Sequence, residues 1–354
     1  MYRRRRRRKP KRYARKWHPA LVILVIAACQ ILTVAAVQGT ETGRELFQTV
    51  LSGFARQPQD AEQSEPSRTE ELFRGFPEKT MVPAGAPAEV SAGTLQNITA
   101  SYPISQLRTF ENLKNLYLFD SDYIVPSPDL FDLDTFLSWD LKADLETEGP
   151  QILIFHTHGS EYYADSGPGG VIQVGEYLKE VLESQYGVRV LHDTTLYDEG
   201  GLDGAYERMA QGVQPILDAN PSIQVTIDLH RDGIGGDGRL VTQIDGKDTA
   251  QVMIVNGISA EYSWETGQME DTSYLANPNR TANLAFSFHL KMAADVLYPG
   301  LMRNIYLSSY RYSTFMREKA ILLEVGAQGN TLQECKAAMD YFAPVLVTVL
   351  EGKG

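Results

Sequence analysis

The chain has 354 residues and a formal net charge of −12 at pH 7, with 33 Lys and Arg against 45 Asp and Glu. The first sixteen residues hold eleven of the basic side chains and no acid, which leaves 22 basic residues against 45 acidic ones in the rest of the chain. A body this acidic repels a phosphate backbone, so the composition excludes nucleic acid as its ligand. The length is sufficient for at least one full hydrophobic core.

An apolar stretch at residues 19–37, PALVILVIAACQILTVAAV, follows the basic run. It contains no charged residue and matches the roughly 20 apolar residues that a membrane-spanning helix needs. Positive charge on its N-terminal flank places that flank in the cytoplasm. We expect a single-pass protein of the cell membrane, with a basic cytoplasmic tail at residues 1–18, a transmembrane anchor at 19–37 and the rest outside. A cleaved signal peptide is the alternative, but the stretch is longer than the usual apolar core of such peptides.

Residues 38–105 are rich in Pro, Ala, Gly, Ser and acidic residues. Such a composition buries too little apolar surface to order itself and predicts a flexible linker. Residues 106–354 have a globular composition and form the predicted extracytoplasmic domain. The chain has two cysteines, Cys29 in the predicted anchor and Cys335 in a late helical pattern. Two are too few for a thiolate zinc site, so any metal must be held by His and carboxylate.

Within the domain, short apolar runs alternate with stretches of helical periodicity. Core strands are expected at residues 152–155, 188–191, 223–229 and 320–326, and helices at 171–186, 205–220, 281–297 and 331–350. Residues 240–246 and 250–257 are expected to form an added pair of strands, and residues 115–141 an irregular leading segment. The alternation predicts an α/β domain with a mostly parallel sheet and helices on both faces.

Polar residues stand where three of these strands end. His156, His158 and Glu161 follow the first strand in ILIFHTHGSEYY, His230 follows the third, and Glu324 lies near the end of the fourth. Sites in open α/β sheets form outside the carboxyl ends of the strands. Two His and one carboxylate with an open fourth position are a common zinc site, so His158, Glu161 and His230 are the predicted ligands of Zn²⁺. Glu324 is the predicted catalytic residue, which takes a proton from water and passes it to a leaving amine.

The ligand set has alternatives. His156 stands in the same motif as His158, and it could bind the metal or orient a ligand from behind. Asp165 and Glu176 are rivals to Glu161 as the carboxylate ligand. A single buried histidine is more often a hydrogen-bonded core residue than a ligand, so the role of His156 stays open at this point.

Neighbouring residues are expected to support the site. Asp228 is expected to orient His230 by a hydrogen bond. Arg231 is the predicted contact for a substrate carboxylate, with a structural ion pair as an equal alternative. His192 and His289 are interpreted as structural, because one ends a strand taken to be non-adjacent and the other lies within a helical pattern. The glycine-rich residues 233–238 lack the ending of a phosphate loop, so they are interpreted as a turn or as a loop that lets backbone approach the site.

With these motifs, the chain from about residue 116 onward resembles the stage II sporulation protein P family. The resemblance is carried, in order, by ILIFHTHGSEYY, YGVRVLHD, NPSIQVTIDLHRDG, YPGLMRNI and AILLEVGAQGNTLQE. It implies a peptidoglycan hydrolase similar to the zinc-dependent N-acetylmuramoyl-L-alanine amidases, which cut the amide between the glycan's lactyl group and the stem peptide. It also implies cleavage of stem-peptide crosslinks, action during engulfment of the forespore, and a sporulation lytic transglycosylase as partner. By this resemblance, His158 and His230 match metal-binding histidines and Glu324 matches the catalytic glutamate.

The sequence therefore predicts a membrane-anchored zinc amidase that acts on peptidoglycan outside the cytoplasmic membrane. A zinc endopeptidase that acts mainly on crosslinks is an alternative, because the two reactions share the same metal chemistry. A non-catalytic, wall-binding assembly module is the third hypothesis, motivated by the long spacer. The presence of both the histidine pair and Glu324 argues against that third hypothesis.

Overall fold

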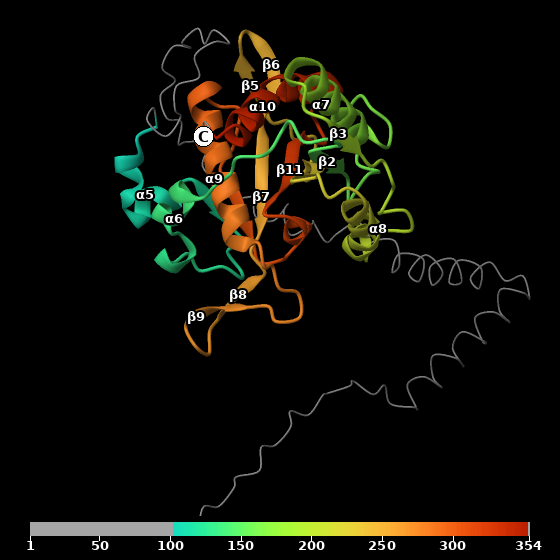
Figure 1. The fold of residues 1–354 in the computed structure, drawn as a ribbon. Coiled ribbons are helices and arrows are strands. Elements are labelled where there is room, and N and C mark those ends of the chain that lie inside the picture. The colour runs from blue at the N-terminus through green and yellow to red at the C-terminus, as the bar shows by residue number, and fades with distance from the viewer. Residues whose placement is uncertain (1–101, 353–354) are drawn as a thin grey trace, which may run out of the picture. The chain divides into compact units, whose positions relative to one another are not determined.

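The structure is a computed structural model that describes residues 102–352. The basic tail, the predicted anchor and nearly all of the predicted linker lie outside this range, so those assignments and their boundaries stay predictions. Among the described residues, no helix is both long enough and apolar enough to cross a membrane. Residues 102–352 form an α/β domain around a seven-stranded sheet (Figure 1).

The sheet has the strand order β1-β10-β7-β11-β4-β2-β3. The four strands β3, β2, β4 and β11 are parallel to one another, and β7, β10 and β1 form a second parallel block that meets the first in the antiparallel pair β7–β11. The predicted mostly parallel sheet is therefore confirmed. The strands are β1 (Tyr117–Phe119), β2 (Ile152–Phe155), β3 (Val190–His192), β4 (Val225–Asp232), β7 (Val252–Gly257), β10 (Ile305–Ser308) and β11 (Lys319–Ala327).

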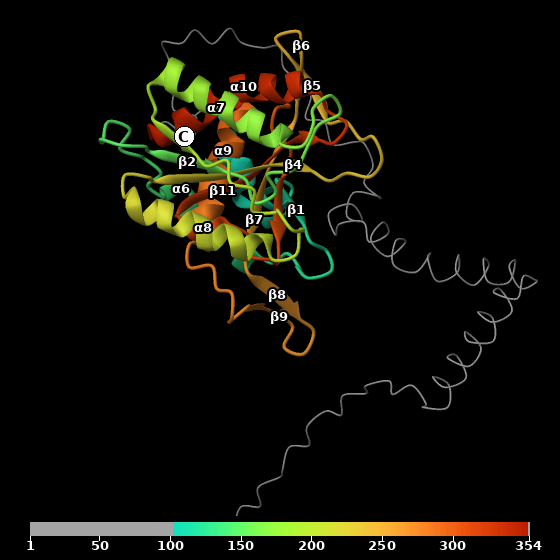
Figure 2. The same cartoon turned by 90° about the vertical axis from the view of Figure 1, so that its right-hand side faces the viewer.

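Helices cover both faces of the sheet, as predicted (Figure 2). Three of them, α7 (Gly170–Tyr186), α9 (Arg280–Leu297) and α10 (Leu332–Leu350), pack in the larger core on one face. The helix α8 (Ala205–Ala219) covers a smaller core on the other face. Below, these are called the α7 face and the α8 face of the sheet.

The two faces divide the side chains of each strand, because successive residues of a strand point in opposite directions. On β4, Ile227 and Leu229 belong to the larger core on the α7 face. Asp228 and His230, which alternate with them, therefore point to the α8 face although both are buried. The alternation decides which candidate residues can meet.

The N-terminus of α10 follows from a local signal in the sequence. Thr331 accepts a hydrogen bond from the backbone N–H of Glu334 (3.3 Å), and the Glu334 carboxylate accepts one from the N–H of Thr331 (3.2 Å). This capping box satisfies two backbone donors that the first turn of a helix leaves open. The helix predicted to begin at Thr331 is thus confirmed, and it begins directly after the strand that carries Glu324.

Two strand predictions were wrong. The strand expected at residues 250–257 is divided between two strands: Ala250 ends β6 (Lys247–Ala250), which pairs with β5 (Val241–Ile244) in a hairpin, whereas β7 joins the main sheet. The leading segment, expected to be irregular, contains the edge strand β1. The sequence did not indicate this strand because three residues are too few to show a periodicity. The segment also contains the short helices η2 (Pro128–Leu130) and α6 (Leu133–Ser138); η1 (Ile104–Arg108) and α5 (Phe110–Lys114) lie before it, and η3 (Thr314–Met316) precedes β11.

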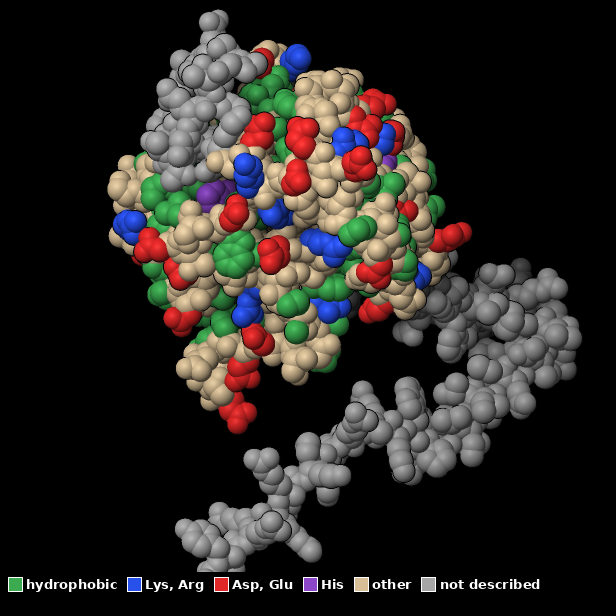
Figure 3. Space-filling view, viewed as in Figure 1, with side chains coloured by type: hydrophobic (Ala, Val, Ile, Leu, Met, Phe, Trp, Pro, Cys, Tyr) green, Lys and Arg blue, Asp and Glu red, His purple; other side chains and the backbone are tan. Residues whose placement is uncertain are grey.

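A second hairpin, β8 (Ala260–Ser263) with β9 (Gln268–Asp271), projects from the end of β7 (Figure 1). Because β7 runs antiparallel to β11, the hairpin lies at the opposite end of the sheet from the carboxyl ends of β4 and β11. Its sequence contains the acidic residues Glu261, Glu265, Glu270 and Asp271, and acidic side chains are visible at the lower edge of Figure 3. The hairpin is therefore remote from the predicted site.

Candidate functional site

The two histidines after β2 go to different sides of the sheet. Ile152 and Ile154 pack in the larger core, so His156 continues this register toward the α7 face. His158 lies in the turn beyond the strand, and its ring packs edge-on against His230, which points to the α8 face (5.1 Å between ring centroids). The register of one strand thus places His158, and not His156, beside His230.

Three side chains form a candidate metal site, called the metal cluster below: His158, Glu161 and His230. One ligand atom from each lies within 4.8 Å of the other two. Nδ1 of His230 is 3.4 Å from Oε2 of Glu161, and the same Oε2 accepts a hydrogen bond from the backbone N–H of Arg231 (3.1 Å). These are the three ligands predicted from the sequence, brought together from the turn after β2 and the end of β4.

Asp228 holds the ring of His230 from the side away from the cluster. Nε2 of His230 donates to Oδ1 of Asp228 (2.7 Å), which leaves Nδ1 facing Glu161. Asp228 is itself fixed by the N–H and the hydroxyl of Thr157 (2.8 and 2.7 Å). Burial alone would raise the pKa of Asp228, but the charge and hydrogen bond of His230, together with Thr157, lower it to about 2. The predicted orienting contact between Asp228 and His230 is present.

The cluster attracts positive charge. Burial would lower the pKa of His230, yet Asp228 and Glu161 outweigh burial and raise that pKa well above its ordinary value. Neutral imidazole and ionised carboxylate are the ligands that Zn²⁺ takes in proteins, and a cation would displace the proton that these acids otherwise draw to the ring. The donor set therefore fits a divalent metal.

Glu324 lies beside the cluster on the neighbouring strand. It is paired in register with His230 across β11 and β4, and its Oε2 is buried without a hydrogen-bond partner. Burial is the main cause that raises the pKa of Glu324 to about 8, and the nearby charge of Asp232 adds to it. A carboxylate held at such a pKa can take up and release a proton near neutral pH.

Unsatisfied polar atoms gather around these residues. Among residues 102–352, seven buried side-chain N or O atoms lack a hydrogen-bond partner, and four of them belong to Asp198, Arg231, Asp232 and Glu324. Such atoms are costly to bury and are rare in folded proteins. Their concentration at one place indicates a site that binds a ligand.

A second histidine group lies on the α7 face and is called the imidazole chain below: Glu176, His192 and His156. Nδ1 of His156 donates to the backbone carbonyl of Leu229 (2.7 Å), and its Nε2 lies 2.9 Å from Nε2 of His192. Nδ1 of His192 lies 2.7 Å from Oε2 of Glu176. A Cβ on Gly175 would come within 2.8 Å of the His156 ring, so α7 has a glycine where the pair needs room.

The hydrogen bonds of the imidazole chain fix its protons. A carbonyl only accepts, so His156 carries hydrogen on Nδ1 and accepts at Nε2 from His192. His192 then donates from its other nitrogen to Glu176. Burial lowers the pKa of His156 to about 4, which agrees with a neutral ring. Every nitrogen in the chain has a partner, and none is directed at the metal cluster.

The other candidate residues of the sequence make contacts outside the metal cluster. Glu176 bonds to His192, and Asp165 accepts the N–H of Leu332 (2.7 Å), so neither belongs to the metal cluster. The strand of His192 was wrongly taken as non-adjacent: β3 pairs directly with β2, which brings His192 to His156. His289 is buried and bonds to the carbonyl of Phe136 (2.9 Å), in keeping with a structural role.

Arg231 combines a tethered backbone with an unsatisfied side chain. Its guanidinium lies 5.9 Å from the centre of the Tyr162 ring, and its Nε is buried without a partner. Its Nη1 donates only to the backbone carbonyl of Asp232 (3.3 Å). Within residues 102–352, no carboxylate forms an ion pair with Arg231, so the structural ion pair is absent there and the substrate contact stays a prediction.

Three residues near the site were missed in the sequence. Tyr206, in the first turn of α8, packs edge-on against the His158 ring (5.5 Å between centroids). Asp198 accepts the N–H of Ser160 (3.1 Å), and Asp232 accepts from Arg303 (2.6 Å). Asp232 alone had a signal, because it continues the alternation of Asp228 and His230. Tyr206 and Asp198 come from segments that only the tertiary fold places here.

The solved structures that this chain resembles have low sequence identity to it and low TM-scores. The catalytic domain of CwlV, an N-acetylmuramoyl-L-alanine amidase from Bacillus (Paenibacillus) polymyxa var. colistinus, has 13% identity and a TM-score of 0.35, with 58% of this chain and 100% of that chain covered. The CwlD amidase from Clostridioides difficile, solved in complex with the GerS lipoprotein, has 11% identity and a TM-score of 0.35, with 57% and 98% covered. Likenesses this weak carry no argument about function.

The chain can be matched to a family through its sequence. Stage II sporulation protein P from Bacillus subtilis (strain 168) is 26% identical in an alignment of length 216 that covers 55% of this chain and 49% of that relative. The chain thus matches about half the length of the curated relative. The family model described as Stage II sporulation protein P (SpoIIP) matches residues 55–347, well over half of the chain. The chain therefore belongs to the SpoIIP family.

Proposed function

We propose that this chain is a zinc-dependent peptidoglycan hydrolase that cuts the N-acetylmuramoyl-L-alanine amide bond during sporulation. We also propose that residues 19–37 anchor it in the cell membrane with the hydrolase domain outside. The observation that carries the proposal is Glu324, a buried carboxylate without a partner, in register with His230 beside the metal cluster. Membership of the SpoIIP family supports the sporulation context and the choice of the wall polymer.

His158, Glu161 and His230 would hold the metal. When bound, Zn²⁺ supplies a Lewis acid that polarises a carbonyl and lowers the pKa of water. Asp228 keeps His230 in the tautomer whose free Nδ1 faces the cluster, and the N–H of Arg231 fixes the Glu161 carboxylate. The protein thus pre-orients two of the three ligands by hydrogen bonds, which reduces the reorganisation needed on binding.

Glu324 is the residue that would transfer the protons of the reaction. Hydrolysis of an amide requires that the attacking water lose a proton and that the departing nitrogen gain one. With a pKa raised to about 8 by burial, Glu324 can carry out both transfers in turn. Arg231, with its unpartnered Nε, would hold a carboxylate of the stem peptide. Tyr206 packs against the ring of His158 and Asp198 holds the backbone of Ser160 in the turn after it, and both side chains would limit the access of water.

The test compares two histidine variants of the full-length chain purified in detergent. Zinc is quantified per chain, and purified sacculi are digested and analysed by mass spectrometry. We expect about one zinc per wild-type chain and release of stem peptides. His230→Ala should lose both properties, whereas the control His289→Ala, at a buried structural histidine on α9, should keep them.

The products decide between the two hydrolase hypotheses. Sugars with free lactyl ends identify the amidase reaction, whereas split crosslinks with intact lactyl amides identify the endopeptidase. Normal digestion by a His230→Ala protein that holds no metal would overturn the proposal.

A further inference from the structure

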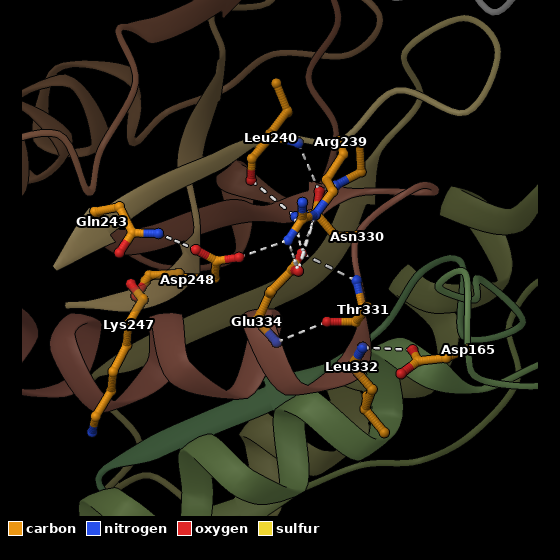
Figure 4. A network of polar contacts seen from close by, with 12 residues as sticks. Asp165, Arg239, Leu240, Gln243, Lys247, Asp248, Asn330, Thr331, Leu332 and Glu334 are labelled. Atoms are coloured by element: carbon orange, nitrogen blue, oxygen red, sulfur yellow. Dashed lines mark hydrogen bonds and ion pairs between the residues drawn. The ribbon is translucent and has the colours of Figure 1, made fainter.

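Three loops that border the site meet at one buried residue, Asn330 (Figure 4). The first, residues 156–169, follows β2 and carries His158 and Glu161. The second, residues 233–240, follows β4 and contains the glycine-rich stretch. The third, residues 328–331, joins β11 to α10 and follows Glu324 by four residues. Below they are called the ligand loop, the glycine loop and the cap loop.

Asn330 is part of the cap loop and bonds to the other two loops. Its backbone carbonyl accepts the N–H of Ala164 in the ligand loop (3.0 Å). Its Oδ1 accepts the N–H of Leu240 in the glycine loop (2.9 Å) and that of Ala327 at the end of β11 (2.9 Å). Its Nδ2 donates to the carbonyl of Leu240 (2.9 Å) and to Oε2 of Glu334 (2.8 Å). The amide side chain therefore uses all its hydrogen-bonding capacity to join the glycine loop to the end of β11 and the first turn of α10, and the backbone carbonyl adds the ligand loop.

The residues around Asn330 reinforce the same junction. Glu334, nearly fully buried, forms an ion pair with Arg239 of the glycine loop, and Arg239 also reaches Asp248 of β6 (3.0 Å), as Figure 4 shows. On the opposite side, Asp165 of the ligand loop accepts the N–H of Leu332 in the first turn of α10 (2.7 Å). The junction is thus anchored to the rigid N-terminus of a helix.

The loops approach one another closely. A Cβ on Gly329 would lie 2.4 Å from the carbonyl oxygens of Asp237 and Gly238, so only glycine fits there without moving the glycine loop. A second tie lies beside Glu324: the hydroxyl of Tyr163, in the ligand loop, donates to the carbonyl of Val325 (3.1 Å). The position of the ligand loop relative to β11 is therefore fixed at two points.

We propose that Asn330 is a positioning residue that sets the distance between the metal cluster and Glu324. Glu161 lies three residues before Ala164, and Glu324 lies three residues before Ala327, so the carboxylate of the metal cluster and Glu324 are both held through short segments that end on Asn330. A metal site loses affinity when the residues that orient its ligands are removed, even though those residues do not touch the metal. The inference rests on the proposed function, because it assigns a role within that same site.

The test measures zinc affinity rather than hydrolysis. Full-length wild type, Asn330→Ala and Asn283→Ala compete with a chromophoric chelator for Zn²⁺. Asn283 is a matched control, because its buried amide also donates to two carbonyls, those of Arg317 (3.0 Å) and Glu318 (2.9 Å), away from the site. We expect about 10-fold to 100-fold weaker zinc binding in Asn330→Ala. Asn283→Ala should bind zinc as the wild type does, even when its stability is lowered equally.

Gly329→Ala is a second variant that keeps the Asn330 amide and separates the loops by steric clash. It should also weaken zinc binding. If Asn330→Ala does not fold, the zinc affinity of Gly329→Ala tests the inference alone. Hydrogen exchange should show faster exchange of the amides of Leu240 and Ala327, whose N–H groups bond to the Asn330 side chain, with α9 unchanged.

Wild-type zinc affinity in both site variants, or an equal loss in Asn283→Ala, would overturn the inference. A wild-type chain that binds zinc but leaves sacculi intact would overturn the proposed function alone. A wild-type chain that binds no zinc would overturn both.

Discussion

The metal cluster and the imidazole chain lie on opposite faces of the same strands, and they differ in how their polar atoms are used. His156 and His192 in the imidazole chain have partners at every ring nitrogen, ending at a backbone carbonyl and at Glu176. The metal cluster faces Glu324, Arg231 and other side chains whose buried atoms have none. Both groups contain two histidines and a glutamate, so residue type alone does not separate them.

Complete or incomplete hydrogen bonding distinguishes a structural histidine group from a binding site. Burying polar groups stabilises a fold only when their hydrogen bonds are complete. The imidazole chain meets this condition and closes the gap between α7 and the sheet. The metal cluster does not, and such a deficit is retained where a ligand or a reaction supplies the missing partner.

The largest effect is expected at Glu324. Glu324→Gln keeps the size of the side chain but removes its ability to carry a proton, so hydrolysis of sacculi should fall by about 10²–10⁴-fold. Zinc content should not change, because Glu324 is not in the metal cluster. Digestion rates and zinc content measured on the same preparation check this. Full activity of the variant would instead favour a non-catalytic wall-binding role.

The next effect is expected at Asp228. Asp228→Ala frees the His230 ring to rotate and to take the other tautomer, so zinc affinity should fall about 10-fold to 100-fold. Chelator competition measures the change, and His289→Ala serves as the control for loss of a buried contact. Unchanged affinity would show that His230 needs no support from behind, which would weaken the contrast between the two histidine groups.

A change in the imidazole chain should affect stability instead of metal binding. His192→Ala leaves Nε2 of His156 without a donor in a buried position, so the free energy of unfolding should drop by about 1–3 kcal/mol. Zinc affinity should stay within about twofold of the wild type, because the chain does not reach the cluster. Denaturant unfolding and chelator competition test the two parts, and a large loss of zinc would merge the two groups into one site.

The smallest effect is expected at Glu176, whose side chain is half exposed. The hydrogen bond from His192 lowers the pKa of Glu176, so its stabilising contribution is present at neutral pH and is lost as the pH falls through the folded-state pKa. Glu176→Gln should cost no more than about 0.5 kcal/mol at pH 7. Unfolding measured against pH should show this difference vanish in acid. A loss of bound zinc in this variant would revive Glu176 as a ligand.

The class of fold and the members of the metal cluster could be predicted from local patterns in the sequence. Strand and helix periods indicated the sheet and its helices, and the carboxyl ends of β2, β4 and β11 located His158, Glu161, His230 and Glu324. The proximity of these side chains could be predicted because strand register and parallel topology bring such ends together regardless of the loops between them. The capping residue Thr331 was also readable, because a capping box is local in the chain.

Features that depend on contacts between distant segments are seen only in the tertiary structure. His156 and His158 are two residues apart and chemically identical, and only the packing of β2 between the α7 and α8 faces separates their roles. The adjacency of β3 to β2, the entry of β7 into the main sheet and the junction at Asn330 have no local signal, because each joins residues far apart in the chain. A sequence records which side chains are present, but their hydrogen-bond partners are fixed when the chain folds.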